Sequence, residues 1–225
     1  MAKGDYYAKS LNARKLFDVY QTKHKRVKQY LNAEIDFVKN NLIATEQVLE
    51  LGAGYGRIVK ELAPHCREII GIDISEDNVM FGKEYLQNIK NANLIAMNAH
   101  NIKFDCSFDA VLCLQNGLSA MRIEPISYIK QLVNIVKQGG RVFISTYSPK
   151  FWEYRLLWFQ EQADKGLLGE IDMEKTKNGV IICKDGFRAT THSYDELNAI
   201  GEASGFGYEV TEVDDSSIFL VINKV

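Results

Sequence analysis

The sequence is poor in residues that break helices, form disulfides or bind metals. Only three prolines occur among its 225 residues, which leaves long stretches free to form helices and strands. The four cysteines form no C-x-x-C pair and match no zinc-ligand spacing, so we expect neither a metal site nor a disulfide framework. Unpaired thiols are typical of a reducing cytoplasm, which is where we expect this protein to act.

Long apolar runs and an excess of one charge are also absent. No apolar stretch reaches the roughly eighteen residues that span a membrane, and the start of the sequence lacks a signal-peptide core. The 27 basic and 29 acidic residues give a net charge of −2, which argues against a nucleic-acid partner. Basic residues gather near the start, either as a solvated face or as an arm that attracts an anionic substrate. The sequence carries no signal for oligomeric state.

Strands and helices alternate through the middle of the chain. Apolar, β-prone runs predict strands at 47–51, 68–73, 93–97, 108–114 and 141–147. Helices are predicted between them at 57–63, 75–89 and 124–140, the last with a proline in its first turn and glycines at its end. This alternation indicates βαβ units and a parallel sheet.

The chain departs from this alternation before the first strand and after the fifth. Residues from about 9 to 41 predict helix with one apolar stripe and a break near Lys23 to Lys25. After the fifth strand, an aromatic-rich helix places Phe151, Tyr154 and Trp158 on one face, either as core or as the lining of an acceptor pocket. An Asp185-Gly186 pair between two β-prone runs then predicts a hairpin.

The α/β pattern returns in the last part of the sequence. A capping box, Ser193 with Glu196, begins a predicted helix at 194–203. Strands at 208–213 and 217–224 follow, and their short link requires them to be antiparallel. We expect a single domain over 1–225, with an N-terminal helical cap (1–44), a core (45–147 and 193–225) and a substrate-lid insertion (148–192).

Three glycines follow the first predicted strand directly, in "VLELGAGYGRI" (48–58). A strand, a glycine turn and a helix form a site for an anion or a nucleotide, because the backbone N–H groups at the helix start point outward. Dinucleotide-binding folds typically show G-x-G-x-x-G, whereas Gly56 comes two residues after Gly54. A nicotinamide-dependent oxidoreductase is therefore the weaker hypothesis.

Chemically suited residues stand at the ends of the predicted strands. In open α/β sheets, ligands bind outside the carboxyl ends of the strands. Asp73, which ends the second strand, is placed to accept hydrogen bonds from a ribose diol. The residues that we expect along this rim are Gly52, Asp73, Asn98, His100, Gln115, Asn116 and Tyr147.

The motif "ELGAGYG" resembles the E/D-x-G-x-G-x-G nucleotide motif of the class I S-adenosylmethionine-dependent methyltransferase family, in its small-molecule type. Asp73, "VKQGGRVFIS" and the closing reversed hairpin strengthen the resemblance, which covers about 45–147 and about 193–225. It implies a Rossmann-like α/β fold. Its mostly parallel sheet would have seven strands in the order 3-2-1-4-5-7-6, with strand seven antiparallel and helices on both faces.

The resemblance also implies a cofactor, S-adenosylmethionine, which leaves as S-adenosylhomocysteine. The glycine turn would meet its methionine part, Asp73 its ribose and Ile74 its adenine. Asn98 stands where the family often has aspartate, so its contact with the adenine carries no charge. The implied cofactor-binding residues are Glu50, Gly52, Ala53, Gly54, Asp73, Ile74, Asn98, Ala99, Leu114, Gln115 and Tyr20. Tyr6 and Tyr7 are expected to close the same site from an N-terminal arm.

The implied reaction is an in-line attack by the acceptor on the sulfonium methyl group, with much of the rate coming from positioning. A general base is required only when the nucleophile must lose a proton. His100, Tyr147 and Asn116 are the candidate catalytic residues, with His192 as a further possibility.

The net charge and the aromatic insertion favour a small-molecule acceptor. The text "LCLQNGLS" lacks the D/N-P-P-Y motif of families that methylate amino groups of DNA or glutamine. Two alternatives stay open: a non-catalytic or regulatory module that binds S-adenosylmethionine, and a methyltransferase that acts on protein or RNA. Turnover with an acceptor would exclude the first.

Overall fold

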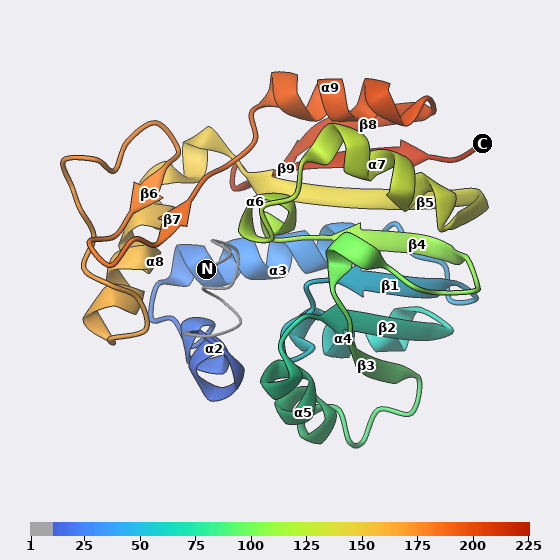
Figure 1. Ribbon diagram of the computed structural model, residues 1–225, viewed down its shortest axis with the longest axis horizontal. Helices are drawn as coiled ribbons and strands as arrows, with labels where there is room; N and C mark the ends of the chain where they lie inside the picture. Colours follow the sequence, from blue (N-terminus) through green and yellow to red (C-terminus); the bar gives the residue numbers. More distant parts are fainter. Residues whose placement is uncertain (1–10) are drawn as a thin grey trace.

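The sheet of this protein has seven strands in the order β3-β2-β1-β4-β5-β9-β8 (Figure 1). A computed structural model describes residues 11–225. The neighbours from β3 to β5 are parallel, whereas β9 runs antiparallel to both β5 and β8. With β9 as the reversed strand, this is the predicted Rossmann-like order.

The elements follow the predicted alternation. The strands are β1 (Gln47–Leu51), β2 (Glu68–Asp73), β3 (Ala92–Ala96), β4 (Phe108–Cys113), β5 (Val136–Tyr147), β6 (Ile181–Ile182), β7 (Arg188–Ala189), β8 (Gly207–Val213) and β9 (Ser217–Asn223). The helices are α2 (Ala13–Val19), α3 (Lys25–Lys39), α4 (Arg57–Leu62), α5 (Glu76–Tyr85), α6 (Gly117–Ala120), α7 (Pro125–Asn134), α8 (Trp152–Asp164) and α9 (Tyr194–Ser204). Short 3₁₀ turns lie at Ala63–His65 (η1), Ala99–Asn101 (η2) and Pro149–Phe151 (η3).

Local signals read from the sequence set several boundaries. The predicted break after α2 falls between Val19 and Lys25. Ser193 and Glu196 form the predicted capping box of α9, and Gly205 ends that helix with a φ of 77°. The short strands β6 and β7 pair as an antiparallel hairpin around the Asp185-Gly186 turn, as predicted.

The helix predicted at 124–140 is shorter than expected, and its end is a correction. Helix α7 stops at Asn134, and β5 already begins at Val136, which pairs with Phe108 of β4. The two glycines belong to this strand. Gly139 donates its N–H to Lys224 O at 2.7 Å, and a Cβ on Gly140 would lie 2.6 Å from Asp109 O. Residues that resemble a helix C-cap in the sequence therefore form part of a strand, because they pair with residues distant in the chain.

Apolar side chains form a core on each face of the sheet and a third core beyond the end of β5. Leu132 of α7 and Ile200 of α9 pack on one face, and Val38 of α3 and Leu62 of α4 pack on the other. The third cluster, which includes Trp158, joins α3 to α8 and the β6–β7 hairpin. Figure 1 shows this insertion beside α2, at the end of the sheet where β5 stops.

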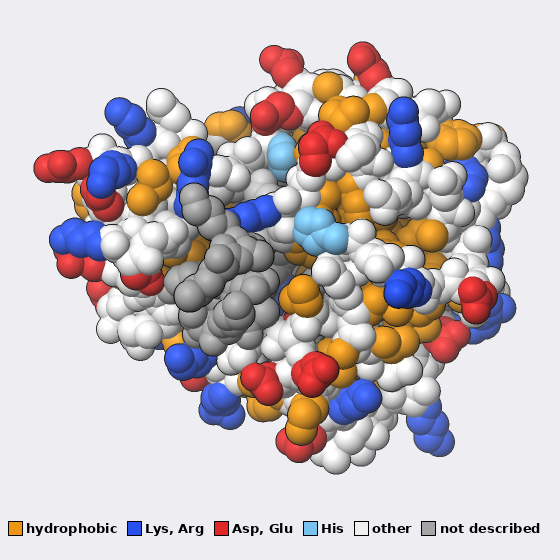
Figure 2. Space-filling model, in the orientation of Figure 1, with side chains coloured by type: hydrophobic (Ala, Val, Ile, Leu, Met, Phe, Trp, Pro, Cys, Tyr) orange, Lys and Arg blue, Asp and Glu red, His pale blue; other side chains and the backbone are white. Residues whose placement is uncertain are grey.

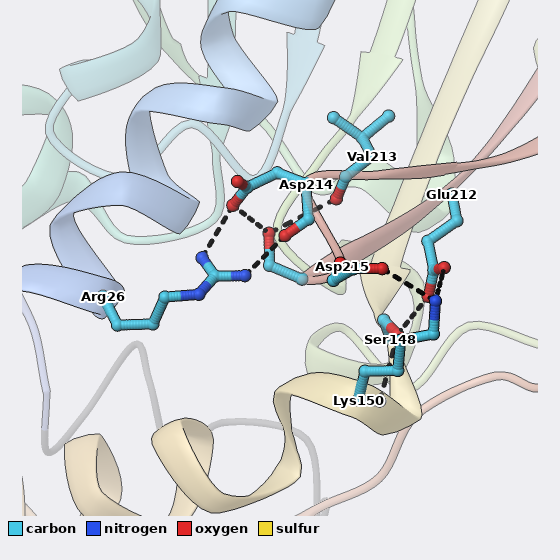
Figure 3. A network of polar contacts seen from close by, with 8 residues as sticks. Arg26, Ser148, Lys150, Glu212, Val213, Asp214 and Asp215 are labelled. Carbon is cyan, nitrogen blue, oxygen red and sulfur yellow. Dashed lines mark hydrogen bonds and ion pairs between the residues drawn. The ribbon is translucent and has the colours of Figure 1, made fainter.

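A polar network fastens α3 and η3 to the turn between β8 and β9 (Figure 3). Arg26 forms an ion pair with Asp214 at 2.6 Å, and Lys150 contacts Asp215 at 2.7 Å and Glu212. Asp214 and Asp215 both have positive φ, which suits a tight hairpin turn. Part of the basic charge near the start of the chain is therefore paired with the acidic charge near its end.

Among the helices of residues 11–225, none combines the length and the apolar composition that crossing a lipid bilayer requires.

The buried glycine of α5 generates a stability prediction. A Cβ on Gly82 would lie 2.2 Å from Leu94 Cδ1 and 2.7 Å from Tyr55 O. We expect Gly82→Ala to lower the free energy of unfolding by about 1–3 kcal/mol, since overpacking outweighs the helix propensity of alanine. Urea denaturation measures the change. Gly207→Ala is the matched control, because nothing lies within 4 Å of that position. Equal stability of both variants would contradict the close packing of α5 on the β1–α4 turn.

Candidate active site

A cavity of about 560 Å³ lies where the parallel strands end. Residues of the β1–α4 turn, of the ends of β2, β4 and β5, and of the segment after β3 line it, and side chains of α2 and α8 close it. Its volume falls within the range of small-molecule sites. On the face drawn in Figure 2, basic and acidic side chains lie mostly toward the periphery.

The glycine turn forms one wall of this cavity. Gly52, Gly54 and Gly56 have φ values of 67°, 56° and 82°, a region that glycine enters without the clash of a Cβ. A Cβ on Gly54 would also lie 2.7 Å from Leu16 Cδ2 of α2. The three glycines therefore allow a tight turn that α2 approaches closely.

Asp73 is held in place by protein donors. Its Oδ2 accepts a hydrogen bond from Gly54 N at 2.9 Å, and its Oδ1 accepts from Ser75 N at 2.9 Å and Asn78 Nδ2 at 3.0 Å. An ionised carboxylate offers about four acceptor positions, so capacity for a ligand hydroxyl remains. Ile74, whose side chain is largely exposed, follows it along the cavity wall.

Two side chains of opposite charge face the cavity beside the glycine turn. Glu50 is 4% exposed, and burial raises its pKa from 4.5 to about 8, although Arg57 opposes the rise. Glu50 Oε2 and Arg57 Nε and Nη2 are buried without a hydrogen-bond partner among residues 11–225. The Arg57 guanidinium lies 4.5 Å from the ring centre of Tyr20. These atoms retain hydrogen-bonding capacity for a ligand.

Arg57 is a site residue that the sequence analysis missed. It occupies the first position of α4, where the positive end of the helix dipole disfavours a cation. A basic residue directly after a glycine turn at a helix start is an unfavourable placement, and this signal could have identified it. Arg57 lines the cavity together with Glu50.

The segment after β3 forms the opposite wall. Asn98 Oδ1 accepts from His100 N at 2.9 Å, and Tyr128 Oη donates to Ala99 O at 2.6 Å. His100 lines the cavity here, with Nε2 3.0 Å from Met121 O. This position puts His100 next to the implied adenine contacts.

Tyr147 and Asn116 differ in their placement. Tyr147, at the end of β5, is buried and lines the cavity, and burial raises its pKa. Asn116 does not line the cavity: its Oδ1 accepts from Thr146 Oγ1 at 2.8 Å and its Nδ2 donates to Thr190 O at 2.7 Å. These two bonds tie the loop after β4 to the end of the insertion, so the structure gives Asn116 a structural place in the fold.

His192 also lies outside the cavity wall. Its backbone N–H donates to Thr146 Oγ1 at 3.2 Å, and burial lowers the pKa of its imidazole. Its closest acidic group is Glu196, at 4.0 Å from Nδ1. His192 therefore belongs to the junction between the insertion and α9.

The aromatic helix α8 contributes to the cavity through part of its length. Trp158 and Phe159 line it, and Trp158 Nε1 donates to Val19 O of α2 at 3.1 Å. Phe151 is buried against Tyr30 instead, and Tyr154 is exposed. Of the predicted aromatic face, Trp158 alone faces the cavity.

Every residue of the predicted cofactor-binding set lines the cavity, together with His100 and Tyr147. Tyr6 and Tyr7 lie outside the described residues. Within residues 11–225, no group of three or more His, Cys, Asp or Glu side chains is arranged to hold a metal ion.

Comparison with known proteins identifies the domain. Residues 48–140 match a family model described as a methyltransferase domain. Together with the strand order, this match supports the predicted resemblance to the class I S-adenosylmethionine-dependent methyltransferases. The predicted Rossmann-like fold is confirmed.

A curated relative covers part of the chain. The mitochondrial ubiquinone biosynthesis O-methyltransferase of Dictyostelium discoideum is 30% identical over 120 residues, which cover 48% of this chain and 37% of that protein. The matches to the first curated relatives span between about a third and a half of those proteins.

Solved structures match over nearly the whole chain at low identity. The DhpI-SAM-HEP complex has a TM-score of 0.65 and 18% identity, and the match covers 98% of each chain. An S-adenosylmethionine-dependent methyltransferase from Clostridium acetobutylicum has a TM-score of 0.59 and 14% identity, with 93% of this chain and 97% of that one covered. These similarities extend the shared fold beyond residues 48–140.

The buried carboxyl of Glu50 generates a pH prediction. A raised folded-state pKa makes a contribution to stability that is fully present below the unfolded pKa of 4.5 and is lost as the pH rises to about 8. We expect Glu50→Gln to flatten the decline in the free energy of unfolding between about pH 5 and 8, measured by urea denaturation. The exposed Glu174→Gln is the control. A Glu50→Gln profile parallel to that of the unmodified protein would contradict the assignment.

Proposed function

We propose that this protein transfers the methyl group of S-adenosylmethionine to a small-molecule acceptor by in-line displacement. The single observation that carries the proposal is the convergence on one cavity of the glycine turn, Asp73 and the buried polar atoms of Glu50 and Arg57 that lack hydrogen-bond partners within residues 11–225. A methyl acceptor enters the same cavity under α8. Positioning the two reactants and excluding water supply most of the rate.

The chemistry of the residues present fits this cofactor. Its methionine end carries an ammonium and a carboxylate, and the sulfonium adds a positive charge. Glu50 offers an unpartnered carboxylate oxygen, and Arg57 offers two unpartnered N–H donors, which suit a carboxylate. Asp73 offers acceptor capacity for the ribose hydroxyls, with Ile74 beside it for the adenine ring.

An apolar, partly enclosed wall supports a small acceptor. Trp158 and Phe159 of the insertion and Val19 of α2 line the cavity near Tyr20 and Tyr147. In the proposal, residues 1–44 form a cap and residues 148–192 a lid over the acceptor. The curated relative named above carries a quinone-pathway O-methyltransferase name, which supports an acceptor with an aromatic or quinone-like ring. The four cysteines are unpaired, which supports a reducing, cytoplasmic setting.

Enclosure also favours a small acceptor over a protein or RNA segment, which would require an open groove. A binding module without turnover would need the same cofactor contacts but no acceptor space. Transfer of labelled methyl groups from S-adenosylmethionine to hydroxylated aromatic compounds separates the two. Cofactor binding without transfer to any such compound would favour the binding module.

Removing the Asp73 carboxylate should weaken cofactor binding. We expect Asp73→Ala to lower the affinity for S-adenosylmethionine by about 10- to 150-fold, or roughly 1.5–3 kcal/mol, because a charge-assisted hydrogen bond is lost. Isothermal titration calorimetry measures the change. Asp73→Asn keeps the side-chain shape, and its affinity for S-adenosylmethionine should lie between those of Asp73→Ala and the unmodified protein.

Asp105→Asn is the matched control, because Asp105 is exposed and outside the cavity wall. Its affinity should equal that of the unmodified protein. A folded Asp73→Ala variant with unchanged affinity would remove Asp73 from the cofactor site.

A further inference from the structure

Glu34 of α3 is a buried carboxyl group that the proposed cofactor site does not use. It is 0% exposed and does not line the cavity. Its Oε1 accepts a hydrogen bond from Ser217 Oγ of β9 at 3.1 Å. Its Oε2 is buried without a hydrogen-bond partner in the described part of the chain. Burying a carboxylate oxygen without a hydrogen-bond partner lowers the stability of the fold, so a functional reason for it is worth seeking.

Burial raises the pKa of Glu34 to about 7, while the hydroxyls of Ser145, Ser217 and Tyr30 and the charge of Arg57 act in the opposite direction. This carboxyl can therefore gain or lose a proton near neutral pH. Burial also raises the pKa values of Tyr30 and Tyr147, so both phenols stay neutral there.

Two short links join Glu34 to the cavity. Tyr30 precedes it by one helical turn on the same face of α3, and the Tyr30 ring lies 5.4 Å from that of Tyr147, which lines the cavity. The two phenol groups also influence each other electrostatically, since Tyr147, in addition to burial, contributes to the raised pKa of Tyr30. In the second link, Ser145 Oγ accepts from the backbone N–H of Gln115 at 2.8 Å, and Gln115 also lines the cavity.

In a purely structural role, Glu34 would link α3 to β9 by a hydrogen bond. That role accounts for the bond to Ser217, but not for the unpartnered second oxygen. Apolar side chains of similar size usually stabilise such a position as well as a buried charge does. A structural role does not require the connection toward the cavity, whereas a role in proton transfer does.

We propose that Glu34 accepts the proton that the methyl acceptor loses, and that the proton passes through the hydroxyls of Tyr147 and Tyr30. This inference rests on the proposed function and adds that the acceptor reacts through an ionisable hydroxyl. The acceptor oxygen forms a bond to the methyl carbon as the S–CH₃ bond breaks, and the electron pair of that bond returns to sulfur. The hydroxyl proton moves to Tyr147, the Tyr147 proton to Tyr30 and the Tyr30 proton to the Glu34 carboxylate.

Along this route, Glu34 is the group that can hold the proton; a second buried carboxyl, Glu50, lines the cavity beside the glycine turn and interacts with Arg57. Tyr30, Tyr147 and Tyr20 are neutral phenols, because burial raises the pKa of each. The Ser145 and Ser217 hydroxyls are not basic. Among the groups of this route, Glu34 alone offers an ionised oxygen that becomes neutral by accepting a proton.

The experiment uses the full-length protein with S-adenosylhomocysteine and the coloured phenol 4-nitrocatechol as the acceptor probe. At about pH 8 Glu34 is ionised, so binding of the probe anion should be accompanied by uptake of close to one proton per site. Calorimetry in buffers of different ionisation enthalpy counts this proton, and the absorbance of the probe reports its charge. Glu34→Gln keeps the side-chain shape and should abolish the uptake.

Three variants sharpen the test. Asp36→Asn changes an exposed carboxyl on the same helix and should leave the uptake unchanged. Ser217→Ala removes a donor to the Glu34 carboxylate, so the uptake should shift to higher pH. Tyr30→Phe keeps Glu34 but breaks the chain of hydroxyls, and proton uptake should lag behind probe binding in a stopped-flow record.

Two results overturn the inference. One is equal proton uptake by the unmodified protein and Glu34→Gln, and the other is failure of 4-nitrocatechol to bind while S-adenosylhomocysteine binds. Either result leaves the proposed cofactor site standing. Failure of S-adenosylhomocysteine itself to bind contradicts the proposed function instead, so the two failures are distinguishable.

Discussion

The hydrogen bond from Gly54 N–H to the Asp73 carboxylate joins the ends of two neighbouring strands, and the arrangement of the site depends on it. Positive φ at the glycines lets the turn after β1 bring this N–H toward β2. The same carboxylate accepts from Asn78, whose Oδ1 accepts from Ala13 N at 2.6 Å. The Asp73 side chain would therefore contact the ribose of the cofactor and the glycine turn, and through Asn78 it is linked to the covering helix α2.

Several buried ionisable side chains in and near the cavity lack full hydrogen-bond pairing in the described part of the chain, unlike the ion pairs that join other elements of the fold. Arg26 and Asp214 pair directly, as do Lys137 and Asp109 at 2.9 Å. Glu50, Arg57 and Glu34 instead keep buried polar atoms without hydrogen-bond partners within residues 11–225. Such atoms lower stability unless a ligand or a transferred proton satisfies them. Their concentration around one cavity is what a site prepared for a charged cofactor and a proton-releasing acceptor would show.

Local patterns predicted most of the fold. The apolar runs of β1, β2 and β4 and the capping box at Ser193 act over a few residues, so they can be read directly from the sequence. The end of α7 could not, because pairing of Val136 with the distant Phe108 decides it. The hydrogen bonds of the Asn116 amide could not be predicted for the same reason: its partner Thr190 is distant in sequence. Strand-end positions nevertheless predicted a cavity wall that includes Asp73, since the fold fixes where the strands end.

The most direct measurement is thermal unfolding of the protein with S-adenosylmethionine, S-adenosylhomocysteine or NADH. A ligand at about 100 times its dissociation constant adds roughly 2.7 kcal/mol of stability, which raises the midpoint temperature measurably. We expect both adenosyl compounds to raise the midpoint and NADH to leave it unchanged. A rise with NADH alone would contradict the account, because the glycine turn and Asp73 would then serve a dinucleotide.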